Sequence, residues 1–382
     1  MSSILIRNGE MIDSEKGIRY HADILIQDEK IIDIAEKIDS KAIFEIDASG
    51  CVITPGLIDH HTHIYPMASI GIPGEAVCFA SGVTTAVDAG STGCENYSQT
   101  RDYVRAGRLD VKSYINVCSL GLSSLPDRME NVSPEDMDEI RIRDTFQQYK
   151  DELLGLKIRT SRSIVGDLGY KPLAAAVKLA EKIDVPLMVH ITDPPGTIDE
   201  LVRLLRPGDI VTHMYQNTGY TILDRNRVSE VVWNARERGV LFEAADARAH
   251  FSFEVCEQAL KEAFIPDLLG TDITKFSMYL RPTAFNMAMQ IAKYNDLGIS
   301  FEKIIQIATW NAAKNLKIAD RVGKIQKEMQ ADIAIFKRCD VKNIFGDRVF
   351  SEHSCSTREG SFVYEPMMTI KNGEVVYRNQ LF

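Results

Sequence analysis

Residues 54–63 read Thr-Pro-Gly-Leu-Ile-Asp-His-His-Thr-His, a Pro-Gly turn followed by a short apolar run and three histidines. The apolar run from residue 57 to residue 61 predicts a buried strand. Side chains alternate between the two faces of a strand, so His61 and His63 point to the same side at its carboxyl end. Two imidazoles on one face can hold one metal ion. An H-x-H pair alone is a weak signal, because surface histidines also pair by chance.

Outward from this strand, short β-branched runs alternate with longer segments of helical period as far as residue 322. The strand candidates are residues 57–61, 83–87, 113–117, 154–158, 186–189, 210–212, 240–242 and the run that starts at 268. Such alternation indicates parallel βα units, and a (β/α)8 barrel takes about 250 residues. We therefore predict a (β/α)8 TIM barrel over residues 55–322. A doubly wound open sheet is the alternative, but no G-x-G-x-x-G follows an early strand.

The two ends of the chain have a different pattern. Residues 1–54 and 323–382 contain short apolar runs separated by turn residues such as Asn8-Gly9 and Asn372-Gly373. The simplest arrangement joins both ends in one small β-sandwich domain, with the barrel inserted between them.

Composition limits the partners and the compartment. The 382 residues carry 44 Lys and Arg against 54 Asp and Glu, a net charge of -10. An acidic surface disfavours nucleic acid and anionic membranes as partners, and we expect a small-molecule substrate instead. We see neither a signal peptide nor an apolar run of the ~20 residues that span a bilayer. Seven widely spaced cysteines without a C-x-x-C pair are typical of reduced thiols, so we expect a cytoplasmic protein.

The remaining histidines strengthen the case for a metal centre. His190 and His213 each follow an apolar run, at the end of a barrel strand where TIM-barrel active sites lie. Asp272 follows the last predicted strand, where a carboxylate can bind metal and accept a proton from water. Taken singly, each histidine could instead be a satisfied core residue, and Asp272 could cap the next helix.

Lys157 stands in the run Leu-Gly-Leu-Lys-Ile-Arg at residues 154–159, which predicts an otherwise apolar strand. A buried ammonium is costly, so this lysine needs a partner or a depressed pKa. A neutral amine can react with carbon dioxide to form a carbamate, which bridges two cations. The alternative is a lysine that extends to the barrel mouth or pairs with an acidic residue.

The motif Pro-Gly-Leu-Ile-Asp-x-His-x-His at residues 55–63, together with Lys157, His190, His213 and Asp272, resembles the amidohydrolase superfamily. The resemblance is strongest to its dihydroorotase-like deacetylase branch. It implies a distorted (β/α)8 barrel, two divalent metal ions, usually zinc, and assembly into homo-oligomers. It also implies that His61, His63 and Asp272 hold the inner ion, that His190 and His213 hold the outer one, and that N6-carboxylysine at Lys157 bridges them.

One segment departs from the pattern of these relatives. Where we expect Gly-His-Gly near the seventh strand, the chain reads Ala245-Asp246-Ala247, with His250 a few residues later. The roles of Asp246 and His250 stay open at this point.

The resemblance implies a hydrolase that uses metal-bound hydroxide to cleave an acyl C–N or C–O bond, with Asp272 moving the proton. A cyclic amidase is the alternative. Arg159, two residues after Lys157 on the same strand face, could clamp a substrate carboxylate. Tyr215, two residues after His213, is a candidate substrate contact by the same geometry, and a packed aromatic side chain is the alternative. Arg162 and Arg281 are weaker candidates on loops.

Overall fold

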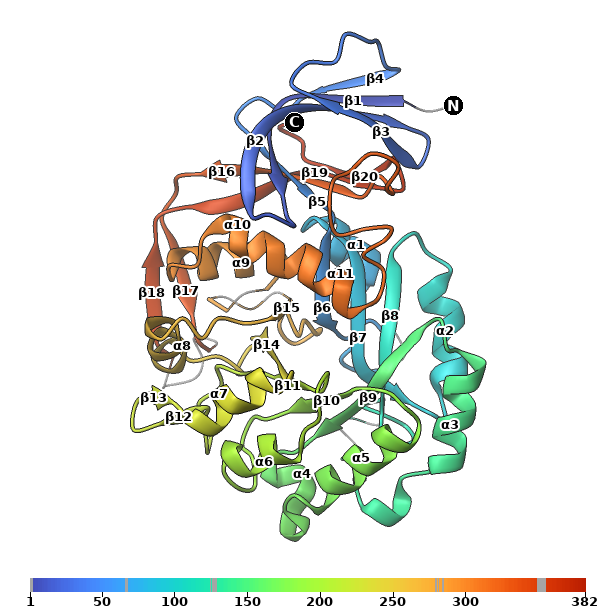
Figure 1. Cartoon of the computed structure of the whole chain (residues 1–382), viewed down its shortest axis with the longest axis vertical. Helices are drawn as coiled ribbons and strands as arrows, with labels where there is room; N and C mark the ends of the chain where they lie inside the picture. The colour runs from blue at the N-terminus through green and yellow to red at the C-terminus, as the bar shows by residue number, and fades with distance from the viewer. Residues whose placement is uncertain are drawn as a thin grey trace.

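A computed structural model describes residues 3–65, 68–123, 125, 129–278, 280, 282–283, 285–348 and 355–382 of the chain. Its larger part is a barrel of parallel strands surrounded by helices, and its smaller part is a sheet to which both chain ends contribute (Figure 1). The predicted TIM barrel with an added β-sandwich domain is therefore confirmed.

Eight parallel strands form the barrel in the order β15-β14-β11-β10-β9-β8-β7-β6. A bridge between Thr62 and Ile273 brings the first strand beside the segment that follows the last, which nearly closes the barrel. The strands are β6 (Leu57–Thr62), β7 (Val83–Gly93), β8 (Asp110–Asn116), β9 (Leu153–Arg159), β10 (Leu187–His190), β11 (Ile210–Thr212), β14 (Leu241–Ala245) and β15 (Leu268–Gly270).

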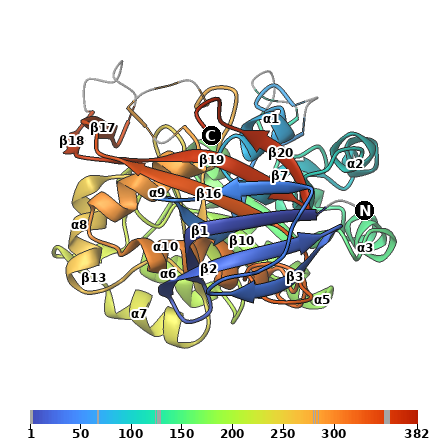
Figure 2. The ribbon, with the colours of Figure 1, turned by 90° about the horizontal axis from the view of Figure 1, so that it is seen from above.

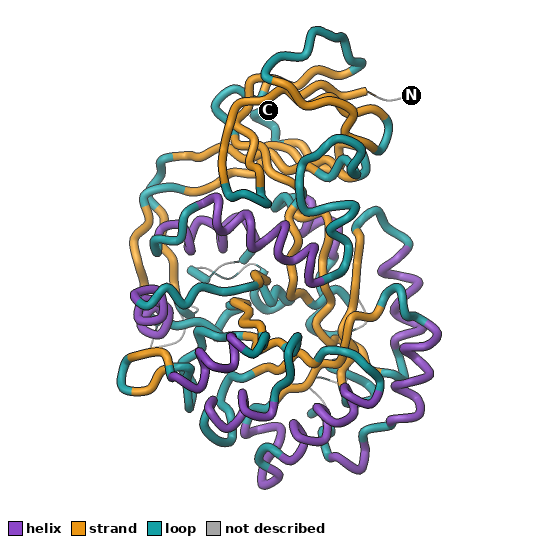
Figure 3. Tube along the Cα trace, viewed as in Figure 1, coloured by secondary structure: helices purple, strands orange, loops and turns teal. Residues whose placement is uncertain are grey.

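Helices cover the outside of this barrel (Figure 3). Their apolar faces and the strands share one large core, which buries the apolar side chains of both. The helices are α1 (Gly74–Phe79), α2 (Tyr97–Arg105), α3 (Glu139–Gln148), α4 (Arg162–Val165), α5 (Lys171–Lys182), α6 (Ile198–Leu204), α7 (Glu230–Glu237), α8 (Phe253–Lys261), α9 (Met287–Asp296), α10 (Phe301–Gln306) and α11 (Ala312–Asn315).

The second sheet has the order β20-β19-β16-β5-β1-β2-β3, with β4 paired to β1. Its strands lie across the top of the barrel when the molecule is viewed from above (Figure 2). From the N-terminal end come β1 (Ser3–Asp13), β2 (Ile18–Gln27), β3 (Lys30–Ala35), β4 (Phe44–Asp47) and β5 (Val52–Pro55); from the other end come β16 (Ile333–Cys339), β19 (Val363–Lys371) and β20 (Glu374–Arg378). The pairing of β5 with β16 joins the two ends.

Two features of this region differ from the sequence-based interpretation. The apolar runs at residues 362–364 and 368–371 are each typical of a separate short strand by sequence, but residues 363–371 form one continuous strand, β19. Its pairing with β16 shifts register next to Pro366. A hairpin of β17 (Asn343–Gly346) and β18 (Thr357–Gly360) was not predicted. Within the described ranges, no helix is long and apolar enough to cross a membrane.

Candidate metal centre

A pocket of about 440 Å³ lies at the carboxyl ends of the barrel strands. Parallel strands all end at the same mouth of a barrel, so residues that follow different strands meet there. Its lining includes the six predicted metal ligands, namely His61, His63, Lys157, His190, His213 and Asp272.

The hydrogen bonds of His63 fix which of its ring nitrogens carries the proton. Ser91 Oγ donates its only hydrogen to Asp88 Oδ2 at 2.7 Å, so it can only accept from His63 Nδ1, which lies 2.9 Å away. The other nitrogen, Nε2, lies 3.0 Å from Asp272 Oδ1. A neutral His63 therefore turns a lone pair toward a carboxylate.

The same reasoning applies to His61 and His213. His61 Nδ1 lies 2.7 Å from Glu243 Oε2, and His213 Nδ1 lies 2.6 Å from the carbonyl oxygen of Ala245. Both partners only accept, so both Nδ1 atoms donate and both Nε2 atoms carry lone pairs. These Nε2 atoms lie 3.5 and 4.0 Å from the carboxylate oxygens of Asp272.

This donor set suits a divalent cation. Burial lowers the pKa of His61 and holds that of His213 well below its usual range, so these rings are neutral at neutral pH. A cation between them would satisfy neutral imidazoles that turn lone pairs toward one buried carboxylate. His61, His213 and Asp272 each offer one ligand atom within 4.8 Å of the other two, and nitrogen and oxygen donors accept zinc, manganese, cobalt or iron.

Lys157 enters this cluster from β9. Its Nζ lies 3.3 Å from His61 Nε2, and its side chain is almost fully buried. Burial lowers the pKa of Lys157 to about 8, which increases the fraction of neutral amine near pH 7. Gly90 on β7 lies so close that a Cβ there would stand 2.7 Å from Lys157 Cβ, so only glycine leaves room for this side chain.

Arg159 also lines the pocket, one pleat further along β9. Its Nε lies 3.2 Å from Glu130 Oε2, and Asn116 donates to the other oxygen of Glu130 at 2.7 Å. A buried acidic partner thus holds the guanidinium in place beside the metal-ligand candidates.

Tyr215, predicted to contact substrate, lies elsewhere. Its ring is buried against Phe251 and Tyr294, and its hydroxyl donates to the carbonyl oxygen of Phe264 at 2.9 Å. The prediction extended strand alternation past His213, but β11 ends at Thr212 and His213 has a φ of 68°. The chain turns there, so the period of two no longer applies. Arg162 donates to the carbonyl oxygen of Pro194, outside the pocket lining, and Arg281 lies outside the described residues.

Two residues of the site were not assigned from the sequence. Glu243 on β14 is fully buried and accepts from both His60 and His61. Glu243 is a single charged residue within an apolar strand, and the same property identified Lys157 as a candidate. His250 lines the pocket beside His190 and His213, and burial lowers its pKa to about 4.

Comparisons with known proteins agree with this architecture. The chain matches the model of the Amidohydrolase family over residues 52–376. A deacetylase of Agrobacterium fabrum is 30% identical over 343 residues, which cover 88% of this chain and 84% of that protein. Solved structures described as an adenine deaminase and a dihydroorotase both have a TM-score of 0.87, at 26% and 28% identity. Each alignment covers 99% of this chain, and 100% and 98% of those chains, respectively.

Fold and site together define a TIM-barrel hydrolase with a centre suited to divalent metal. The chain belongs to the amidohydrolase family, as its match over residues 52–376 shows.

Proposed function

We propose that the protein hydrolyses an acyl C–N or C–O bond of a small carboxylated substrate, as a deacetylase or esterase does. The observation that carries this proposal is the position of Arg159 on the wall of the pocket that also holds the histidines and Asp272. A guanidinium held by a buried partner can bind a carboxylate in a bidentate manner, which would orient the substrate for attack.

The proposed centre takes two divalent ions, with zinc as the first choice. His61, His63 and Asp272 would hold the inner ion, His190 and His213 the outer one, and Lys157, as N6-carboxylysine, would bridge them. When bound, such a pair supplies a water of lowered pKa and polarises the scissile carbonyl.

The side chains of the protein then direct the proton and the substrate. Asp272 would accept the proton from the attacking water and deliver it to the leaving nitrogen or oxygen. The products are a carboxylic acid and an amine or alcohol. Arg159 would keep the substrate carboxylate away from Asp272, so that the scissile bond faces Asp272.

Ring opening of a cyclic amide is the second candidate, favoured by the similarity to the solved dihydroorotase. Both reactions add water across an acyl bond, so one screen that separates substrates from products by liquid chromatography compares them. The panel pairs N-acetyl amino acids and acetylated hydroxy acids of both chiralities with dihydroorotate, hydantoins and lactams.

Zinc-loaded wild-type protein is expected to turn over the acetylated set, and Asp272→Asn serves as the blank. Turnover of cyclic substrates alone would replace the deacetylase proposal by the cyclic amidase. Turnover of neutral acetylated compounds as fast as carboxylated ones would remove the role given to Arg159.

A further inference from the structure

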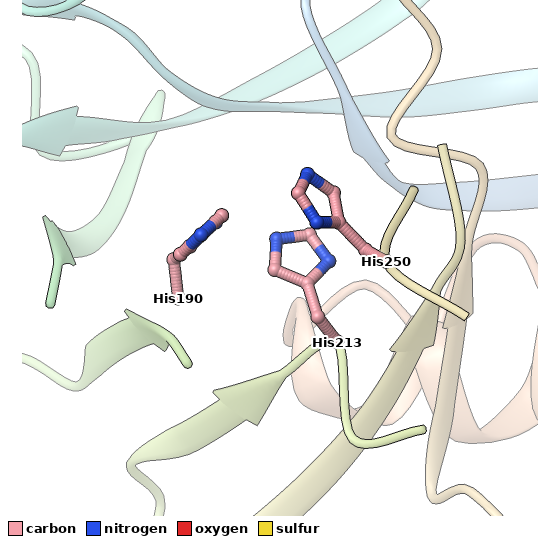
Figure 4. Close-up of side chains that lie close together, drawn as sticks. All are labelled: His190, His213 and His250. Atoms are coloured by element: carbon pink, nitrogen blue, oxygen red, sulfur yellow. The ribbon is translucent and has the colours of Figure 1, made fainter. Parts of the chain in front are cut away.

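His250 brings a third imidazole to the outer side of the pocket. Its ring centroid lies 5.0 Å from that of His190 and 4.4 Å from that of His213. Figure 4 shows the three rings around a common space, although they come from three different segments of the barrel mouth. One ring nitrogen of each lies within 4.8 Å of those of the other two.

The loop after β14 is built to hold His250 in this position. Ala247 has a φ of 45°, a conformation that costs energy for any residue with a Cβ and persists where the surroundings enforce it. Its N–H donates to the carbonyl oxygen of Thr271, and the N–H of His250 donates to that of Asp246 at 2.9 Å. Asp246 itself is buried and bonded to Lys293 and Tyr294 of α9. A rigid helix thus anchors the turn that returns His250 to the pocket.

The two nitrogens of His250 have different surroundings. Nδ1 lies 2.9 Å from Thr192 Oγ1, a hydroxyl that can accept its proton. Nε2 lies 3.7 Å from Asp272 Oδ2, which is also the carboxylate oxygen nearest to His213 Nε2. When Nδ1 of His250 donates to Thr192, its Nε2 carries the lone pair. This lone pair and the lone pair of His213 Nε2 are then both turned toward Asp272 Oδ2.

We propose that His250 is a ligand of the outer metal ion, which it binds together with His190 and His213. This inference rests on the metal-dependent hydrolase proposed above and deepens its outer site. Nitrogens at about 2.1 Å from one tetrahedral zinc ion stand roughly 3.4 Å apart, so small rotations of the three rings bring them to bonding distance. Thr192 then acts as the positioning residue that fixes the tautomer of His250.

Metal binding tests this assignment without any substrate. Apo protein is titrated with Co²⁺ in bicarbonate buffer, and the affinity of each ion and its visible absorption are recorded. Wild-type protein is expected to bind two ions. His250→Ala is expected to bind the first with unchanged affinity and the second at least about tenfold more weakly, with an altered spectrum for that ion.

Two further variants complete the experiment. His21→Ala removes a histidine on β2 that is exposed, and it is expected to match the wild type. Thr192→Val keeps the size of the side chain and is expected to weaken only the second ion, by a smaller factor. This variant tests the proposal even where His250→Ala fails to fold.

Unchanged affinities and spectra in both His250→Ala and Thr192→Val would overturn the proposal, and so would a wild-type protein that takes up a single ion. A third outcome separates the two proposals. If the wild type binds two ions and His250→Ala loses the second, the assignment of His250 is supported. If the wild type then hydrolyses nothing in the panel, the proposed substrate class is refuted.

Discussion

The Nδ1 atom of His61 lies 2.7 Å from Glu243 Oε2, so a carboxylate on β14 orients a histidine on β6. Glu243 bonds His60 Nδ1 with its other oxygen at 2.6 Å. In Glu243→Gln, one of the two histidines faces an amide N–H instead of an acceptor. We expect inner-ion affinity to fall about 10- to 100-fold, measured by competition with a chelator. Glu237→Gln, the same change on the exposed side of α7, should leave metal affinity unchanged.

Lys157→Ala should lose metal and hydrolytic activity together, with activity reduced at least about 100-fold. Short-chain carboxylic acids are expected to restore part of both, because they can occupy the space of the carbamate. Elemental analysis and turnover are measured on the same samples. Full activity in the unsupplemented variant would contradict the bridging role.

Arg159→Met should raise KM for carboxylated substrates by roughly 10- to 100-fold, because a charge-assisted hydrogen bond contributes about 1.5–3 kcal/mol. The same change leaves Glu130 buried without its cation, which could disturb the pocket by itself. Arg159→Met combined with Glu130→Gln removes that charge. If KM rises equally for neutral analogues in the double variant, Arg159 does not select carboxylates.

Lys293 and Asp246 form an ion pair in which both side chains are almost fully buried. Lys293→Met removes one partner and leaves an uncompensated carboxylate, so we expect a loss of about 3–5 kcal/mol in the free energy of unfolding by urea. Asp246→Asn added to Lys293→Met should recover most of this loss, since asparagine still accepts from Tyr294. Additive losses in the double variant would show that the two residues act independently.

Asp296 is the last residue of α9, and partial burial raises its pKa. Because the folded-state pKa lies above the unfolded one, the folded protein binds this proton more tightly, and stability falls as pH rises through the two values. Asp296→Asn should therefore match the wild type near pH 3 and be slightly more stable at pH 7, by an amount that solvent screening keeps small. Thermal unfolding at several pH values measures this difference, and a constant gap across pH would contradict the assignment.

The sequence predicts the barrel well because its signals are local. Each apolar run predicts one strand. The carboxyl ends of parallel strands lie at the same end of the barrel, so the residues that follow the runs are expected to lie close together. His190 and His213 do lie together in the pocket. Lys157 could be selected because charge is rare inside a strand, and Glu243 meets the same criterion.

Tyr215 and His250 show where local signals end. Alternation applies only as long as the strand continues, and the positive φ of His213 ends it before Tyr215. His250 reaches the pocket only because the chain reverses at Ala247, at a conformation that sequence rules assign to glycine. Contacts with α9 and Thr271, which are distant in the sequence, hold the chain reversal at Ala247. No local spacing in the sequence therefore predicts that His250 lines the pocket.

The pairing of β5 with β16 also has a consequence for synthesis on the ribosome. Thr54 of β5 pairs with Ala334 of β16, which lies 280 residues further along the chain. The first five strands therefore emerge long before the partner that completes their sheet, and closing so long a loop is slow. A nascent chain must keep the unpaired edge of β5 from other chains until the barrel has been made, so this edge is where we expect chaperones to bind and aggregation to begin.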